Sequence, residues 1–439
     1  MSKLITSEAF AFLINNVPAI DVHTHLNAAH LGARGLHDIL LYHMVISDLY
    51  CAGGPDGNRL SDEPGEDEIT GRIERAIPFL PLTENTSCYY LMRTILTDLY
   101  DWHDKITSAN WRTLDKRIRD RAAKTQWPYE VFKKSGVLKA GTESALSNGG
   151  SHDDLLFYAL EWAFLARMQW GVFDAPLFEL EYAWQQDAPS RPLPIGLQQR
   201  PAVARQITTV ADVRRAVAHY CGRIPTGVLS TAQHLSTDID YRLVTDNEMQ
   251  RALDNRADAG PEEMNVYAAY SLEMFLTQLG KSAKPIIFQF SFGAEPLPFE
   301  TGSRLHSKTI AQLAAIISRH PRVHFQCFLA SRYANQGLCT LCRELPNLSL
   351  AGYWWHNFFT AIIPQIIEER LDMLSLNKQV GFFSDAYCVE WMYAKSKLVR
   401  NLLGEILFKR VAAGRYDVDT ALEIATQLLR ETPRKLLGV

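Results

Sequence analysis

The stretch PAIDVHTHL at residues 18–26 carries the strongest structural signal in the sequence. Its apolar run is continuous rather than alternating, which is typical of a parallel strand buried on both faces. Because side chains on a strand alternate between faces, His23 and His25 are expected to point the same way. Two neighbouring imidazoles suit a borderline metal such as zinc, with a carboxylate as a natural third ligand. The alternative is two ordinary histidines on a strand.

Seven further apolar runs have the same character, and helix-like segments follow most of them. The eight predicted strands lie at residues 18–26, 136–142, 163–169, 226–232, 285–293, 322–330, 348–355 and 379–386. The predicted helices after the later strands lie at 307–320, 338–345, 360–374 and 388–407. This alternation, without a dinucleotide-binding glycine motif, predicts an α/β fold: a closed (β/α)8 TIM-type barrel.

The length of 439 residues suits one barrel domain, 1–439, that carries an insertion. Residues 26–135 are predicted to form a mostly helical insertion after the first strand. A Pro-rich stretch at 187–201 is predicted to be a surface loop before a helix at 208–221. Both insertions follow strands, so we expect them at the C-terminal face, where barrel enzymes have their sites.

Ser384 and Asp385 end the last predicted strand. A buried carboxylate there needs a cation or several hydrogen-bond donors. Because the first and last strands of a closed barrel are neighbours, we expect Asp385 beside His23 and His25, where the three would bind one divalent metal. The alternative is that Asp385 caps the helix that follows it.

The order and spacing of several short motifs resemble those of the uronate isomerases, which belong to the amidohydrolase superfamily. The resemblance covers most of the chain and is thinner across the insertion. The motifs are the His23/His25 pair, Tyr42-His43, Arg332 in LASRYANQ, Trp354-Trp355 and Ser384-Asp385.

The resemblance implies an isomerase that interconverts the aldose and ketose forms of glucuronate and galacturonate. It implies one metal, zinc, on His23, His25 and Asp385, and a proton transfer between C2 and C1. Candidates for the proton-transfer group are Tyr42, His43, Asp385 and a metal-bound water. A histidine can titrate near neutral pH, which favours His43. The alternative for Tyr42 and His43 is a helix face that packs on the barrel.

A sugar acid also needs a partner for its carboxylate, and a guanidinium matches that group bidentately. Arg167 aligns with an arginine that the family has in this strand, and Arg332 is the second candidate. The alternative for each is a structural salt bridge. Trp354 and Trp355 are candidates for the pocket wall, although such a pair is more often partly in the core.

The sequence departs from the family at several positions. Tyr387 stands where typical members have an arginine, which puts uronate specificity in doubt although it remains a candidate substrate contact. Ser291 stands where many relatives have a histidine, which favours one metal over two. The turn after the second strand supplies only Glu143 as an acidic residue. His234 and His356 are interpreted as loop histidines rather than ligands.

The composition limits the classes of partner. The net charge is −4, and no block of basic residues is present, which argues against nucleic acid and anionic membranes. Seven scattered cysteines favour a reducing cytoplasm, and Cys339 and Cys342 are interpreted as packing residues of a helix. The N-terminal residues are expected to form an amphipathic helix rather than a signal peptide, and no apolar stretch is long enough to span a membrane.

Three functions stay open at the level of sequence. The first is the uronate isomerase, with a small sugar acid as partner and a homo-oligomeric assembly as the resemblance implies. The second is a metal-dependent hydrolase or decarboxylase on the same scaffold, because a fold does not determine its chemistry. The third is an inactive barrel that binds sugar acids, against which the retention of His23, His25 and Asp385 speaks.

Overall fold

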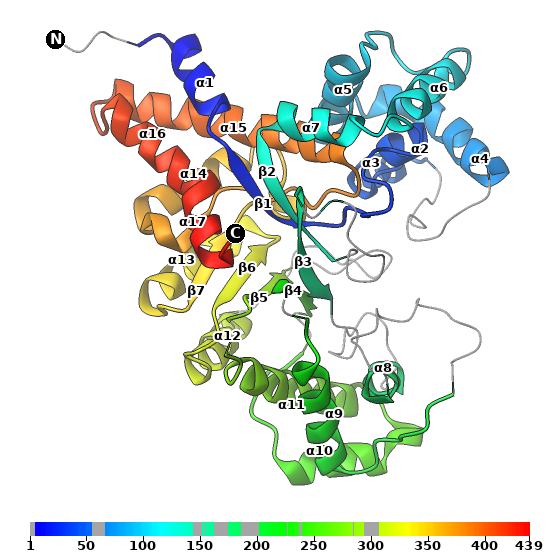
Figure 1. Cartoon of the computed structure of the whole chain (residues 1–439), viewed down its shortest axis with the longest axis vertical. Helices are drawn as coiled ribbons and strands as arrows, with labels where there is room; N and C mark the ends of the chain where they lie inside the picture. The colour runs from blue at the N-terminus through cyan, green and yellow to red at the C-terminus, as the bar shows by residue number, and fades with distance from the viewer. Residues whose placement is uncertain are drawn as a thin grey trace. The chain divides into compact units, whose positions relative to one another are not determined.

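The chain divides into two compact units in a computed structural model (Figure 1). The residues described are 5–54, 66–143, 152, 154–161, 174–185, 202–225, 227–236, 239–283, 285–293 and 307–439. The first unit comprises Met1–Leu156, Asn357–Glu368 and Gly381–Pro433. The second comprises Phe157–His356, Glu369–Val380 and Arg434–Val439.

Parallel strands alternate with helices in chain order, which confirms the predicted α/β fold of the TIM-barrel type. The strands are β1 (Ala19–Thr24), β2 (Val137–Thr142), β3 (Leu156–Glu161), β4 (Val228–Leu235), β5 (Phe288–Phe292), β6 (Phe325–Leu329), β7 (Leu348–Ala351) and β8 (Gln379–Val380). β1 pairs with β2 in the first unit. In the second unit, parallel ladders join each strand from β3 to β8 to the next. Across the described part of the chain, these ladders do not close into a complete barrel.

Two predicted strands differ from the structure. The third strand is β3, which precedes the predicted segment 163–169; that segment lies outside the described residues. Both belong to one long apolar stretch, in which periodicity alone cannot locate a strand. The last strand is only two residues long, and residues 381–386 continue as irregular backbone. One reason is that Asp385 has a positive φ of 55°, which a regular strand does not contain.

The helices of the first unit pack largely on one long helix. They are α1 (Ser7–Asn15), α2 (Leu36–Leu40), α3 (His43–Cys51), α4 (Glu66–Ala76), η1 (Ile77–Leu82), α5 (Ser87–Tyr100), α6 (Trp111–Ala122), α7 (Trp127–Ser135), α15 (Val389–Ala412), α16 (Val418–Thr426) and η8 (Gln427–Glu431). α1, α5 and α7 all contact α15 (Figure 1). The helices α2 to α7 are those of the stretch between β1 and β2.

A buried carboxylate connects α15 to this stretch. Glu390 is fully buried and accepts hydrogen bonds from the Tyr100 hydroxyl and the Trp127 indole N–H, each at 2.7 Å. It also accepts the backbone N–H of Ala33 at 2.9 Å. Three donors compensate the burial of the charge. The first turn of α15 is therefore attached to the stretch between β1 and β2.

The second unit also contains helices between its strands. They are α8 (Asp174–Gln185), α9 (Val210–Gly222), α10 (Asp246–Asp254), η4 (Arg256–Asp258), α11 (Pro261–Leu279), α12 (Ser307–Arg319), η5 (Arg332–Ala334), α13 (Asn335–Glu344) and η7 (Leu376–Lys378). Three short elements span both units: η6 (Trp355–Asn357), α14 (Ile363–Met373) and α17 (Thr432–Leu437). The predicted helices at 208–221, 307–320, 338–345, 360–374 and 388–407 correspond to α9 and α12 to α15 and are confirmed.

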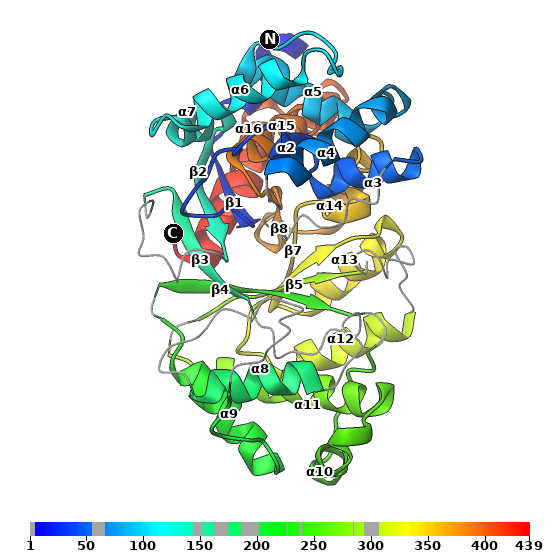
Figure 2. The same cartoon turned by 90° about the vertical axis from the view of Figure 1, so that its right-hand side faces the viewer.

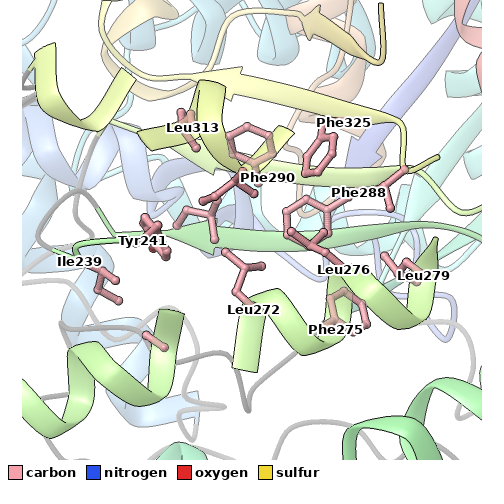
Figure 3. Close-up of a cluster of buried hydrophobic side chains, with 14 of the residues drawn as sticks. Ile239, Tyr241, Leu272, Phe275, Leu276, Leu279, Phe288, Phe290, Leu313 and Phe325 are labelled. Carbon is pink, nitrogen blue, oxygen red and sulfur yellow. The ribbon is translucent and has the colours of Figure 1, made fainter. Parts of the chain in front are cut away.

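The core of the second unit forms where helices cover the strands. Phe288 and Phe290 of β5 alternate with Gln289, so the aromatic rings share one face of the sheet. Phe275 of α11 packs against Phe288 with ring centroids 6.0 Å apart, and Phe288 contacts Phe325 of β6 at 5.6 Å (Figure 3). Figure 2 shows α8 to α11 together on one side of β4 and β5. On the other face, the side-chain amide of Gln289 donates to the side-chain carbonyl of Gln326 at 2.7 Å.

Two predictions from composition can be compared with the structure. Cys339 and Cys342 are fully buried free thiols on α13, which confirms that they are packing residues. Among the described residues, no helix combines the length and the apolar character that a membrane-spanning segment requires.

Candidate metal centre

β1 presents two imidazoles at its C-terminal end. His23 and His25 lie on the same side of the chain, with ring centroids 4.9 Å apart and planes at 83°. Thr24 lies between them on the opposite face, where its hydroxyl donates to the Gly141 carbonyl of β2 at 2.7 Å. Strand alternation therefore directs the two imidazoles to one place, as predicted.

The segment after β8 brings Asp385 alongside β1. The Asp385 N–H donates to the His23 carbonyl at 3.1 Å, and the His25 N–H donates to the Ala386 carbonyl at 2.9 Å. The buried side chain of Asp21 accepts the Ser384 N–H at 2.9 Å. These bonds hold the segment in register with the end of β1.

Asp385 does not cap the following helix. α15 begins at Val389 with Cys388 as its N-cap residue, and no side chain caps that end. The alternative interpretation of Asp385 as a helix cap is therefore wrong. Its carboxylate faces the two imidazoles instead.

One carboxylate oxygen faces both histidines. Asp385 Oδ1 lies 3.4 Å from His23 Nε2 and 3.2 Å from His25 Nε2. All three side chains offer ligand atoms within 4.8 Å of one another. In a tetrahedral zinc site with bonds of about 2.1 Å, neighbouring ligand atoms are about 3.4 Å apart. The donor types and their separations therefore fit one divalent ion.

The charge environment also suits a cation. Burial alone would raise the pKa of Asp385, but hydrogen bonds from His23 and His25 hold it well below the usual range. Burial alone would lower the pKa of His25, but Tyr387, Glu143 and Asp385 raise it well above its ordinary value. The site therefore keeps its carboxylate ionised and stabilises positive charge between the imidazoles.

A hydrogen-bond network holds the backbone of Asp385 in place. The Tyr42 hydroxyl donates to the Asp385 carbonyl at 2.8 Å. The ammonium of Lys395, on α15, donates to Tyr42 Oη and to the Ser384 carbonyl, each at 2.7 Å. Burial lowers the pKa of Lys395 to about 8. Tyr42 is the N-cap residue of α3 and is almost fully buried, so its hydroxyl is engaged in positioning Asp385.

His43 lies next to the second oxygen of Asp385. Its Nε2 is 3.8 Å from Asp385 Oδ2, and its ring contacts that of Tyr42 at 4.2 Å. Burial lowers the pKa of His43 to about 3. Burial therefore favours the neutral imidazole, which is the form that accepts a proton.

Known proteins resemble this chain in structure and not detectably in sequence. No protein-family model matches the sequence, and no curated protein does. The uronate isomerase of Thermotoga maritima superposes with a TM-score of 0.75 at 12% identity, covering 99% of this chain and 98% of that one. The glucuronate isomerase of Caulobacter crescentus has a TM-score of 0.77 at 15% identity, covering 98% and 93%. A uronate isomerase from Bacillus halodurans has a TM-score of 0.67 at 15% identity, covering 99% and 98%.

The chain has the uronate isomerase fold. The match extends over nearly the whole of each of these chains, so the likeness is not limited to a shared barrel core.

Tyr387 lies beside the candidate metal ligands. Its ring stacks on His25 with centroids 4.7 Å apart and planes at 19°. It also contacts the ring of His43 at 5.5 Å. Tyr387 is 48% exposed, so part of it faces away from the protein. An aromatic surface thus stands at the position where the resemblance implies an arginine.

The other predicted substrate contacts belong to the second unit. Trp354 is buried, with its ring 5.8 Å from His234 and 5.7 Å from Trp355. Arg332 begins η5 directly after β6, and its guanidinium lies 5.2 Å from the ring centre of Tyr333. These residues follow the C-terminal ends of β6 and β7, where substrates bind in this fold class. Arg167 lies outside the described residues.

Two residues at the site were not among the predicted site residues. Glu143 follows β2 and faces both histidines, with its carboxylate oxygens 3.8 Å from His23 Nδ1 and 3.4 Å from His25 Nδ1. An acidic residue directly after a buried strand was the available signal. Lys395 lies in an apolar part of α15, where a fully buried lysine signals a specific partner.

Proposed function

We propose that this chain is a metal-dependent isomerase that interconverts the aldose and ketose forms of hexuronates such as glucuronate and galacturonate. His23, His25 and Asp385 would hold one divalent ion, zinc by the chemistry of the donors. The observation that carries the proposal is the convergence of both Nε2 atoms on Asp385 Oδ1, at 3.4 and 3.2 Å. The likeness in fold to three uronate isomerases supports it.

The isomerisation moves one proton between carbons. The proton leaves C2 of the aldose and arrives at C1, while the hydroxyl proton of O2 passes to O1, so that the atoms balance. A divalent ion at this site would supply positive charge for the oxygens that become negative. The protein must supply a group that accepts the C2 proton and returns it.

We assign the proton transfer to Nε2 of His43. Its Nε2 lies 3.8 Å from Asp385 Oδ2, the oxygen that does not face the two histidines, and burial favours the neutral form of the ring. The protonated imidazole would be stabilised by that carboxylate until the proton returns to C1. Tyr42 is less suited to accept a proton, because burial raises its pKa well above 10 and its hydroxyl already serves Asp385.

The substrate carboxylate would be bound by Arg167 and Arg332, and Trp354, Trp355 and Tyr387 would line the sugar. The exposed part of Tyr387 offers an aromatic face of the kind that packs on the C–H groups of a sugar. The partner would thus be a small sugar acid. We also propose that the chain is one domain with a helical insertion at 26–135 and that it assembles as a homo-oligomer.

Incubation with glucuronate or galacturonate in heavy water tests the isomerase. We expect formation of the keto sugar in the zinc-loaded protein, with deuterium at C1 when the proton exchanges during transfer. The variant His43→Gln should lose at least about 100-fold in turnover, within the range of general acid–base contributions. Absence of any keto product from a panel of hexuronates would overturn the proposal.

A second candidate is a metal-dependent hydrolase. Two observations favour it: Tyr387 stands in place of the family's arginine, and a Lactobacillus casei protein proposed to be a metal-dependent hydrolase superposes with a TM-score of 0.56. That match has 14% identity and covers 98% of this chain and 97% of that one. A panel of lactones, esters and amides distinguishes the two, since only a hydrolase releases an acid from them.

A further inference from the structure

Glu143 is held next to the two histidines by strand pairing. It directly follows β2, whose last residue Thr142 is in register with Thr24 of β1. The residue after Thr142 is therefore level with His25, which follows Thr24. The Thr142 hydroxyl donates to the Leu26 carbonyl, which fixes this end of β2 on the chain beyond His25.

The two carboxylates meet the imidazoles in different ways. Asp385 presents a single oxygen, Oδ1, to both Nε2 atoms. Glu143 presents a separate oxygen to each histidine, Oε1 to His23 Nδ1 at 3.8 Å and Oε2 to His25 Nδ1 at 3.4 Å. A single oxygen near both Nε2 atoms fits a metal ion that is bound by all three side chains. Two oxygens that each face a different Nδ1 atom fit two N–H donors, one for each oxygen.

We propose that Glu143 is a positioning residue that accepts the Nδ1–H groups of both His23 and His25. It thereby fixes each ring in the tautomer and orientation that direct the Nε2 lone pair to the metal. This inference rests on the proposed metal centre and deepens it. Carboxylates often orient metal-binding histidines in this manner, with one ring each; here one carboxylate serves two rings.

The burial of Glu143 supports a specific role. Only 13% of its side chain is exposed, and an ionised carboxylate that is largely buried needs donors. His25 Nδ1 at 3.4 Å and His23 Nδ1 at 3.8 Å are placed to supply them. The negative charge of Glu143 also raises the affinity of the two Nε2 atoms for a cation, because an N–H···O bond at Nδ1 makes each ring a better metal ligand.

The isosteric variant Glu143→Gln tests the proposal. The amide keeps one acceptor oxygen and presents an NH2 group to the other ring, so only one Nδ1–H can be accepted. We expect zinc affinity, measured by chelator competition, to fall about 10- to 100-fold. Glu143→Ala should change it in the same direction, and the exposed Glu130→Gln on α7 is the matched control with unchanged affinity.

Spectroscopy separates positioning from general structural damage. Histidine-labelled protein loaded with zinc should show two hydrogen-bonded Nδ1–H resonances, and one of them should shift or disappear in Glu143→Gln. The visible spectrum of the cobalt-loaded variant should change as well, while its unfolding midpoint without metal stays near wild type. Wild-type zinc affinity together with unchanged Nδ1–H resonances would overturn the proposal.

The zinc-affinity test of Glu143 does not depend on which reaction the protein catalyses. A loss of affinity in Glu143→Gln supports the role of Glu143 even when the wild-type protein isomerises no hexuronate. Conversely, an active isomerase whose Glu143→Gln variant binds zinc normally retains the proposed function and contradicts the role of Glu143. A larger loss than that of His23→Ala would identify Glu143 as a ligand itself and overturn its assignment as a positioning residue.

Discussion

Asp385 connects the two ends of the chain at the candidate metal centre, and its backbone is unusual. Its φ of 55° lies in the left-handed region, which aspartate tolerates better than most residues but which still costs about 1 kcal/mol or more. The surrounding bonds offset this cost, since Tyr42 binds its carbonyl and His23 binds its N–H. Strain at this position is consistent with a site whose geometry is held by its neighbours.

The candidate histidine ligands give the most direct prediction at the level of a residue. His23→Ala removes one of three ligands, so zinc affinity should fall by more than the roughly 10- to 100-fold typical of outer-shell changes. Metal content after dialysis and chelator competition measure this. His103→Ala changes an exposed histidine and should retain wild-type metal content. Full metal content in His23→Ala would contradict the ligand assignment.

Lys395 gives a second prediction at this scale. Lys395→Met keeps the length of the side chain but removes the donor to Tyr42 and to the Ser384 carbonyl. The segment that carries Asp385 should loosen, and zinc affinity should fall about tenfold. The half-exposed Lys397, two residues along α15, pairs with Asp98, and Lys397→Met should leave zinc affinity unchanged. Equal zinc affinities for the two variants would contradict the proposed role of Lys395.

Sequence reasoning found the residues with a local signature and missed those without one. His23 and His25 could be predicted because strand alternation directs both to one face. Asp385 required the additional expectation that the first and last strands are neighbours. Lys395 has no such pattern, and Glu143 has only its position directly after a buried strand, because a single carboxylate or lysine acquires a role only through the distant residues that it contacts. The place of Arg167 stays a prediction.

At the scale of elements, helices were easier to predict than strands. α12 and α13 have strong apolar periodicity over ten or more residues, which indicates a helix. α15 is buried along much of its surface and lacks this periodicity, so its length is what favours a helix over a strand. β3 was displaced because the apolar stretch that contains it continues well beyond its end. The prediction for β8 was too long because backbone irregularity at Asp385 has no signature in apolar content.

The N-terminus of α9 gives a prediction for pH dependence. Thr209 and Asp212 form a capping box: each side chain accepts a backbone N–H of the other residue. Burial alone would raise the pKa of Asp212, but hydrogen bonds from Thr209 and Arg215 lower it from 3.8 to about 2. Because the folded pKa is below the unfolded one, the stabilisation is complete above about pH 4. It is lost as the pH falls from about 4 to about 2.

Urea unfolding of Asp212→Ala measures this contribution. At pH 7 the variant should be less stable than wild type by about 1 kcal/mol, as for other N-terminal caps. The difference should shrink as the pH approaches 3, since Asp212 of the unfolded chain then takes up a proton while Asp212 of the folded chain stays largely ionised. Asp258→Ala, in η4 of the same unit, is a control that should show no such trend. A difference that stays constant down to pH 3 would argue against an ionised cap.

On the scale of the whole molecule, the three candidate ligands come from residues 23, 25 and 385, which are far apart in sequence but belong to one compact unit. An ion bound there joins two segments of the first unit that are far apart in sequence. The bound ion should therefore stabilise the folded state of the first unit and not that of the second. The second unit has its own core, built on α11, β5 and β6.

Hydrogen exchange with and without zinc tests this localisation. With free zinc at 100 times Kd, binding stabilises the folded site by about 2.7 kcal/mol, which slows exchange up to about 100-fold for openings that break the site. Amides of β1, residues 381–386 and α3 should show this protection, whereas those of α9 and α11 should exchange at nearly the same rate in both states. Removal of zinc by a chelator should reverse the change. Equal protection in α9 and α11 would mean that the ion acts on the fold through contacts other than His23, His25 and Asp385.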